Sequence, residues 1–404
     1  MKNSLGDLAL LGGEPEFDDP IYVGRPTNIN REDLFRRLGL ALDRQWLTND
    51  GPLCRALEER IADLVSVKHC VAVSSGTVGL QLVIRALGLT GEIIMPSMTF
   101  IATAHAARWL GLDPRFCDID PVTRQIDPDL IGVLVTPRTS AVLGVHLWGR
   151  VCDTDRIGAV SETHGLPVFY DAAHAIGCTR SGRPAGGAGA AEVFSLHATK
   201  VVGAFEGGAV TTNDDGLAEL LRGLRTFGGG GSSPWGGTNA KMSEASAAMG
   251  LCSLDVLKKS VEDNQSNLDA YRTYLADIPG LLPPPDLPGE AGNHQYAVVE
   301  VFAEETGVDR DLLRQVLLAE NIVAKPYFSP PCHLHAPYVA QRPVRLPHTE
   351  ALAARTLALP TGSAVGTREV RRICSVIRLA LSRGRALAER HRSAVSNHRK
   401  GPRP

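Results

Sequence analysis

Short apolar runs alternate with amphipathic segments along most of the chain. Runs typical of buried strands occupy residues 70–73, 93–95, 115–117, 140–145, 166–170, 193–196 and 209–212. Helical spacing of apolar residues predicts helices over 31–44, 52–65 and 101–110. A further helix follows residues 70–73, because Leu80, Val83, Ile84 and Leu87 recur at helical intervals. Strands that alternate with helices predict an α/β fold built on a mostly parallel sheet.

The pattern changes after residue 241 and divides the chain. Residues 242–277 read as one long helix that links two domains, and the prolines of 283–288 then interrupt the pattern. Beyond them we expect strands at 296–302 and 322–325 and helices at 309–320 and 368–388. The predicted units are an N-terminal arm (1–30), a large domain (31–260), a small α/β domain (261–388) and a basic, disordered tail (389–404).

Composition narrows the class of protein. A chain of 404 residues with 44% hydrophobic and 21% charged residues is typical of a folded globular protein. The net charge of −2 indicates no general attraction to nucleic acid or to a membrane. Eight scattered cysteines without a CxxC pair favour reduced thiols, and the N-terminal apolar run is too short for a signal peptide. We therefore expect a cytoplasmic protein.

Two charged residues stand where buried strands end. Lys200 lies between the strands predicted at 193–196 and 209–212, and Asp171 follows the strand at 166–170. Desolvation lowers the pKa of a lysine and makes its free amine nucleophilic, so Lys200 is a candidate Schiff-base residue. A lysine at a loop edge with its amine in water is the alternative. A carboxylate at the carboxyl end of a strand lies where α/β sheets bind ligands.

A third feature adds an anion site. Ser75, Gly76 and Thr77 form a small-residue turn between a strand and a helix, and such a turn presents free N–H groups to a phosphate. The same residues would also suit plain helix capping. Pyridoxal phosphate (PLP) needs a Schiff-base lysine, an acid that faces the pyridine nitrogen and an anion site. Lys200, Asp171 and residues 75–77 match these needs.

Seven motifs in a fixed order then carry a family resemblance. They are SSGT (74–77), PSMTFIAT (96–103), VHLWGR (145–150), YDAAHAIG (170–177), FSLHATK (194–200), FEGGAVTTND (205–214) and TNAKMSE (238–244). From residue 40 into the small domain, the chain resembles the DegT-type PLP-dependent nucleotide-sugar aminotransferases. The resemblance implies the aspartate-aminotransferase fold (fold type I), with a large domain, a smaller C-terminal domain and homodimers that share active sites.

The resemblance also implies roles for single residues, each with a plainer alternative. Phe100 would stack on the pyridine ring, although a core phenylalanine is common. His174 would bond the phenolic oxygen of PLP, or be a satisfied core histidine. Ser195 would bind the phosphate, or be a small strand residue. Asn239 would reach the phosphate in the other subunit, where Lys241 serves the same anion or is a solvated surface lysine.

Substrate contacts are expected from three more residues. Trp235, beside a glycine-rich loop, would stack on a base or sugar, or simply pack. Tyr327 and His333 fall in a stretch that the resemblance places at the mouth of the substrate site. His333 and His335 alone do not predict a metal site, since no second ligand cluster supports them.

The expected reaction is amino transfer, with Lys200, Asp171 and His174 as catalytic residues. By resemblance, L-glutamate is the amino donor and a dTDP-4-keto-6-deoxyhexose is the acceptor. Lys200 argues against the dehydratases of the family, which carry histidine at that position. A cyclitol or aminobenzoate-type aminotransferase and a non-catalytic sensor or regulator with a PLP-type fold are the alternatives.

Overall fold

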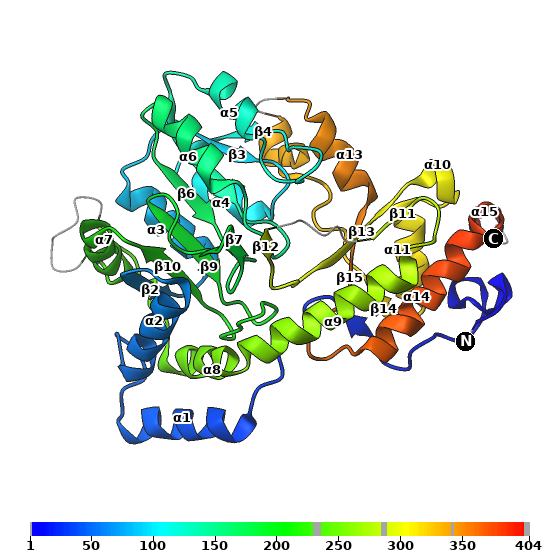
Figure 1. The fold of residues 1–404 in the computed structure, drawn as a ribbon, viewed down its shortest axis with the longest axis horizontal. Coiled ribbons are helices and arrows are strands. Elements are labelled where there is room, and N and C mark those ends of the chain that lie inside the picture. Colours follow the sequence, from blue (N-terminus) through cyan, green and yellow to red (C-terminus); the bar gives the residue numbers. More distant parts are fainter. Residues whose placement is uncertain (1, 229–235, 284–288, 341–342, 400–404) are drawn as a thin grey trace, which may run out of the picture.

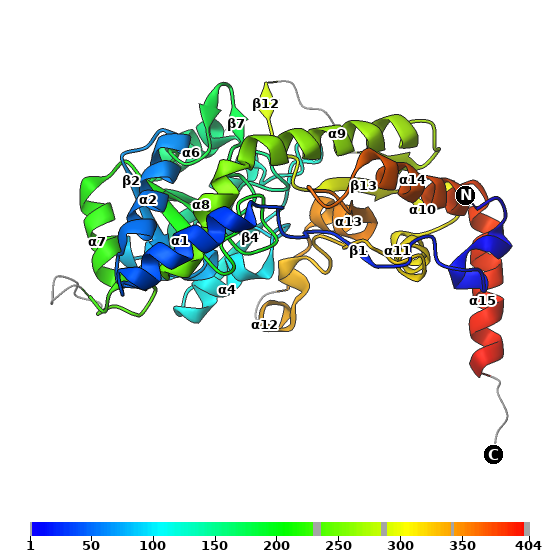
Figure 2. The ribbon, with the colours of Figure 1, turned by 90° about the horizontal axis from the view of Figure 1, so that it is seen from below.

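The chain folds into two units joined by a long helix. The computed structural model describes residues 2–228, 236–283, 289–340 and 343–399. Figure 1 shows a large unit around one sheet, and a helix that runs from it to a smaller unit. The view from below shows helix α1 (Arg31–Asp43) lying across the large unit, and helix α15 (Gly384–Arg399) projecting from the smaller unit (Figure 2).

Seven strands form the central sheet of the large unit. Their order is β2 (His69–Val73), β10 (Gly208–Thr212), β9 (Ala191–Ser195), β6 (Val168–Asp171), β5 (Thr139–Val145), β3 (Glu92–Pro96) and β4 (Asp113–Cys117). Strand β10 runs antiparallel to both of its neighbours, and the other adjacent pairs are parallel. This confirms the predicted α/β fold with a mostly parallel sheet.

Both faces of this sheet are buried, which explains why its strands read as continuous apolar runs. Val71 and Val73 of β2 belong to the core on one face, whereas Cys70 and Ala72 belong to the core on the other. Successive side chains of a strand point to opposite faces, so a strand covered on both sides needs apolar residues throughout.

Helices cover the two faces of the sheet. The helices of the large unit are α1 (Arg31–Asp43), α2 (Pro52–Val65), α3 (Gly76–Ala86), α4 (Ile101–Trp109), α5 (Pro128–Leu134), α6 (Thr154–Thr163), α7 (Asp215–Arg225) and α8 (Glu244–Asp255). The side chains of Ser75, Asp214 and Ser243 accept backbone N–H groups at the starts of α3, α7 and α8. Such caps satisfy donors that have no partner within a helix, and so they determine where each helix begins.

The smaller unit is built on a three-stranded antiparallel sheet. Its strands, in order, are β11 (Leu281–Leu282), β13 (Ala297–Val301) and β15 (Thr356–Leu359). Its helices are α10 (Ala303–Thr306), α11 (Arg310–Ala319), α13 (Pro347–Arg355), α14 (Thr367–Ser382) and α15 (Gly384–Arg399). Helix α12 (Ala336–Val339) lies against the large unit, where its Tyr338 packs in the core beside Phe116. A second three-stranded sheet joins β7 (Thr179–Arg180) and β8 (Arg183–Pro184) of the large unit to β12 (Glu290–Ala291).

The N-terminal arm packs on the smaller unit. Strand β1 (Ile21–Tyr22) pairs in parallel with β14 (Ile322–Val323), and Leu8 and Phe17 enter the core around the small sheet. The fully buried Glu320 carboxylate accepts the N–H groups of Ala9 and Glu16 and pairs with Lys2. The arm is therefore part of this core, which the composition of residues 1–30 did not indicate.

Two predicted helices are each divided in the structure. The segment 242–277 forms α8 and α9 (Leu257–Leu275), separated at Val256. The helix expected over 368–388 ends at Ser382, and α15 starts at Gly384, whose missing Cβ would lie 1.9 Å from the Thr306 carbonyl oxygen. This close approach needs a glycine, so the tertiary contact decides where the helix breaks.

Helix α15 also corrects the expectation for the tail. It continues to Arg399, so residues 389–399 are helical rather than disordered, and residues 400–404 lie outside the described part of the chain. The domain boundary predicted after residue 260 lies within α9. Leu257 of that helix packs in a core of the large unit, whereas Leu268 and Tyr271 pack in the core of the smaller one. Among the described residues, none of the helices combines the length and the apolar composition that crossing a bilayer requires.

Candidate active site

One cavity of about 320 Å³ gathers most of the residues that the sequence singled out. Among its lining residues are Ser75, Gly76, Thr77, Phe100, Asp171, His174, Ser195, Lys200 and Tyr327. Asp171 ends β6 and His146 follows β5, so both stand at the carboxyl edge of the parallel strands. Ligands of open α/β sheets bind at this edge, and the cavity is therefore the candidate active site.

Lys200 lies in the turn that follows β9, and its amine points into the cavity. Its Nζ is 5.9 Å from the centre of the Tyr296 ring. Desolvation lowers the pKa of this lysine from 10.5 to about 8, although the charge of Asp171 acts in the opposite direction. The neutral, nucleophilic amine is thus far more abundant near neutral pH than in an ordinary lysine, although it is still the minor form.

Asp171 is held by two hydrogen bonds at the end of β6. The Thr103 hydroxyl donates to Oδ2 (2.7 Å), and the N–H of Ala173 donates to Oδ1 (3.0 Å). Burial raises the pKa of the Asp171 carboxyl, whereas both hydrogen bonds and the charge of Lys200 act to lower it. Each carboxylate oxygen accepts one of these hydrogen bonds and retains a free lone pair, so the Asp171 carboxylate can accept a further hydrogen bond from an N–H group of a ligand.

His174 presents a defined tautomer to the cavity. Its Nδ1 accepts the backbone N–H of Trp148 (3.3 Å), so the proton of the neutral ring lies on Nε2. Burial holds the pKa of this imidazole well below its usual range. The ring stacks on Phe328 with 6.1 Å between centres and meets Tyr296 edge-on at 5.0 Å. His174 can therefore donate a hydrogen bond from Nε2 to a ligand oxygen.

The first turn of α3 and the ends of β9 and β10 form a close-packed cradle. A Cβ at Gly76 would lie 3.2 Å from the Ser195 Cβ, and one at Gly208 would lie 2.6 Å from the Gly76 nitrogen. Glycines thus bring the helix N-terminus against Ser195, and Thr77 lines the cavity beside it. The positive end of the helix dipole, free N–H groups and hydroxyls together suit a phosphate.

Several residues that line the cavity or hold its lining residues were missed or only partly noticed in the sequence. Thr103 carries a hydrogen bond to Asp171, and its position in PSMTFIAT, three residues after Phe100, was the available signal. His146 was seen only as the polar end of a strand. Its Nε2 lies 2.9 Å from the buried Glu192 carboxylate. Tyr296 and Phe328 come from the C-terminal third. Phe328 adjoins Tyr327 in the stretch that the resemblance placed at the mouth of the substrate site, whereas the local sequence around Tyr296 indicates nothing about a distant cavity.

Other predicted residues lie away from the cavity. His333 is buried with its Nδ1 2.6 Å from the Ser97 hydroxyl and its Nε2 3.4 Å from Glu350. Because both ring nitrogens have partners within the protein, this placement does not support a substrate contact. Asn239 is exposed, and the amine of Lys241 lies 4.6 Å from the centre of the Phe227 ring. Trp235 lies outside the described residues.

Together, these features define a class of enzyme. A desolvated lysine, a carboxylate with a free lone pair, a neutral histidine donor and a phosphate cradle meet in one cavity of an α/β fold, and this set fits PLP. The model of the DegT/DnrJ/EryC1/StrS aminotransferase family matches residues 28–378. The chain belongs to this family and is a PLP-dependent aminotransferase.

Individual relatives agree with this assignment. GDP-perosamine synthase of Caulobacter vibrioides is 33% identical over 346 residues, which cover 83% of this chain and 92% of that protein. The dTDP-4-amino-4,6-dideoxy-D-glucose transaminase of Shigella dysenteriae is 32% identical over 364 residues, 89% of this chain and 99% of that protein. The crystal structure of DesI in the presence of its TDP-sugar product is 55% identical, with a TM-score of 0.95 over 96% of this chain and 100% of that one.

Proposed function

We propose that this enzyme transfers the amino group of L-glutamate to a dTDP-4-keto-6-deoxyhexose, in the biosynthesis of a deoxyaminosugar. The observation that carries the proposal is the similarity to DesI, since 55% identity over nearly the whole chain accompanies a TM-score of 0.95. The product of DesI is a TDP-sugar. The transaminase of Shigella dysenteriae is likewise named for a dTDP-sugar.

The residues of the cavity provide a place for each part of the cofactor. Lys200 would hold PLP covalently, Asp171 would accept the pyridine N–H, and His174 would donate to the phenolic oxygen. Phe100 would cover one face of the ring, while Ser195 and residues 75–77 would hold the phosphate. When bound, PLP supplies an electrophilic carbon and a ring that accepts electrons.

Proton transfer falls to Lys200. With PLP bound, the neutral amine of Lys200 would take the proton from the Cα of the amino donor and pass it to the cofactor, and its pKa near 8 suits this role. In the second half of the reaction, the same amine delivers a proton to the former keto carbon of the sugar. Asp171, held in place by hydrogen bonds from Thr103 and Ala173, would in its ionised form stabilise positive charge at the pyridine nitrogen.

The acceptor is tested by a panel of ketones with glutamate as donor. We expect kcat/KM for the dTDP-4-keto-6-deoxyhexose to exceed that for a cyclitol ketone by about 10²-fold or more, because the nucleotide adds specific contacts. Product formation is followed by liquid chromatography and mass spectrometry, with Lys200→Ala as the inactive control. Amination of the cyclitol ketone alone would replace this proposal with the cyclitol alternative.

We further propose that the enzyme is a homodimer with shared active sites. Apolar side chains of α1 and the segment after it are unusually exposed in the single chain, with Phe35 at 60%, Leu42 at 63% and Leu47 at 52%. Phe100 lines the cavity and is still 54% exposed, so the cavity wall is open to a second subunit. In this arrangement Asn239 and Lys241 reach the phosphate site of the partner.

Mixed dimers test the shared site. Lys200→Ala and Asn239→Ala homodimers should each be nearly inactive. Refolding them together should restore about a quarter of wild-type activity, since half of the randomly paired dimers have one intact site of two. Activity is measured per mole of chain, and analytical ultracentrifugation reports the oligomeric state. No recovery in a mixture that contains dimers would show that each site is built from one chain.

The cellular location is proposed to be the cytoplasm. All eight cysteines are buried and free, and several of them pack in hydrophobic cores. Free thiols are the usual state in a reducing compartment.

A further inference from the structure

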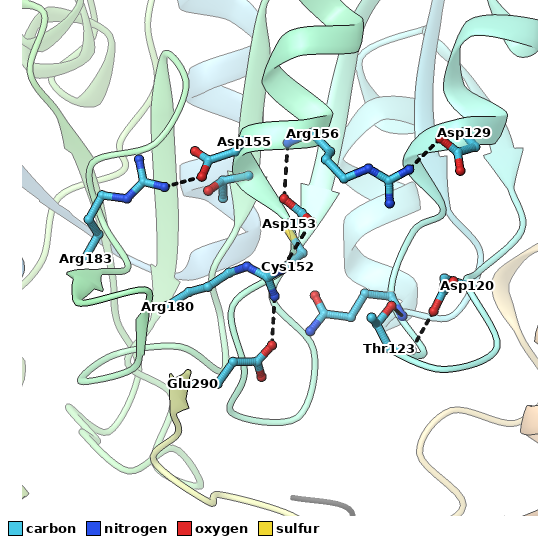
Figure 3. A network of polar contacts seen from close by, with 12 residues as sticks. Asp120, Thr123, Asp129, Cys152, Asp153, Asp155, Arg156, Arg180, Arg183 and Glu290 are labelled. Carbon is cyan, nitrogen blue, oxygen red and sulfur yellow. Dashed lines mark hydrogen bonds and ion pairs between the residues drawn. The ribbon is translucent and has the colours of Figure 1, made fainter. Parts of the chain in front are cut away.

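Residues 293–296 (Asn-His-Gln-Tyr) connect β12 to β13 and touch both of the turns that carry the candidate catalytic residues. Strand β12, just before this segment, is anchored by Glu290, whose carboxylate pairs with Arg150 (2.9 Å) and Arg180 (2.8 Å). Arg180 also pairs with Asp153 at the start of α6 (3.1 Å), as Figure 3 shows. The segment is therefore fixed to the large unit before the chain enters the small sheet.

Gln295 holds the peptide groups on both sides of Lys200. Its Nε2 donates to the Thr199 carbonyl oxygen (2.7 Å), and its Oε1 accepts the N–H of Val201 (3.3 Å). Gln295 is 6% exposed, and its bond to Val201 is buried whereas its bond to Thr199 is partly buried. A primary amide offers one donor side and one acceptor side, and here both are used on the backbone of a single turn.

Two other side chains, Thr27 and Asn293, complete the support of these turns. The Thr27 hydroxyl, from the N-terminal arm, donates to the Val201 carbonyl oxygen (3.0 Å). The Asn293 Nδ2 donates to the carbonyl oxygens of His174 (2.8 Å) and Ile176 (3.0 Å), and its Oδ1 accepts the N–H of Gln295 (3.0 Å). The turn of Lys200 and the turn of His174 are thus held by neighbouring residues of one segment.

We propose that Gln295 is a positioning residue for Lys200, which sets the place of the lysine amine by fixing the two peptide groups that flank it. A lysine side chain has four flexible carbons, and its reach is decided by the position of its Cα and by the walls around it. Loss of the amide would leave the buried Val201 N–H and the partly buried Thr199 carbonyl without this partner, and the turn would move to satisfy them. The inference rests on the proposed role of Lys200.

The test replaces Gln295 with methionine, which keeps the length and removes both hydrogen bonds. Gln315→Met, on an exposed face of α11, is the matched control. The first readout uses cofactor-free protein: competitive acetylation across a pH series, with the Lys200 peptide quantified by mass spectrometry, reports the pKa of the amine. We expect the midpoint to rise from about 8 by about one pH unit, because a displaced amine is better solvated.

The second readout is kinetic. In Gln295→Met we expect kcat to fall by about 10- to 100-fold with KM for glutamate changed by less than about threefold, because a misplaced base affects the transition state more than donor binding. Gln295→Glu, which keeps an acceptor for the Val201 N–H, should lie between Met and wild type. It also provides a second variant if the methionine variant does not fold.

The outcomes separate the two proposals. A lower melting temperature with an unchanged Lys200 midpoint and unchanged kcat would show that Gln295 has only a structural role and would overturn this inference. Borohydride trapping of PLP followed by peptide mapping examines the assignment of Lys200 itself. Cofactor attached to another lysine would overturn the proposed function, whatever the Gln295 variants show.

Discussion

Lys200→Ala should lower turnover by about 10⁴-fold, which is the upper range for a positioned proton-transfer group. The same change should abolish the visible absorption of covalently bound PLP, because Lys200 supplies the only amine among the described lining residues of the cavity. Transamination is measured with glutamate and the keto-sugar nucleotide, and the absorption spectrum is recorded after PLP is added.

A matched lysine change separates this effect from general damage. Lys258→Ala, on an exposed position of α9, should leave both activity and spectrum unchanged. Circular dichroism of Lys200→Ala should match wild type, since the variant removes a charge from a cavity and opens no gap in a core. Retained turnover in a correctly folded Lys200→Ala protein would eliminate Lys200 as the catalytic amine.

Asp171→Asn should lower kcat by about 10²- to 10³-fold, the usual loss when one electrostatic stabiliser of a transition state is removed. Asparagine keeps the shape and can still accept the hydrogen bond from Thr103. It carries no negative charge, so it no longer favours the protonated pyridine nitrogen. Steady-state kinetics of both half-reactions, with PLP at saturating concentration, measures the effect.

The same variant predicts a change in the pKa of Lys200. The Asp171 carboxylate raises that pKa against the effect of desolvation, so its removal should move the Lys200 midpoint below about 8. Competitive acetylation of the cofactor-free protein measures this shift, and Asp19→Asn at an exposed position is the control. A kcat within about threefold of wild type would show that the carboxylate has no electrostatic role in the reaction.

The local pattern of apolar and polar residues was sufficient to predict much of the large unit. The run 193–196 became β9 and the run 209–212 became β10, and the intervening Lys200 was recognised because a charge between buried strands is unusual. Asp171 was found in the same way, at the end of β6. Such features are visible in sequence because burial on both faces of a sheet leaves a continuous apolar run with a polar end.

The ends of helices and the partners of long-range contacts were harder to predict from the sequence. The break at Gly384 depends on its contact with the Thr306 carbonyl, and the packing of the N-terminal arm depends on the buried Glu320. His333 is a further case, since its place in the sequence suggested a substrate contact, whereas its two ring nitrogens lie beside Ser97 and Glu350 and the contact remains a prediction. These outcomes depend on residues far away in the chain.

By itself, then, the sequence determined the fold class and the positions of the sheet-forming segments along the chain, and it singled out Lys200 and Asp171, because burial and strand polarity leave local patterns. His174 was singled out only by the family resemblance. Only the tertiary structure decided which residues surround them. Thr103 reaches Asp171 across 68 positions of sequence, and Gln295 reaches the turn of Lys200 across 96 positions. A hydrogen bond between distant segments has no periodic signature, since its geometry exists only after the sheet, the linking helix and the small unit have packed together.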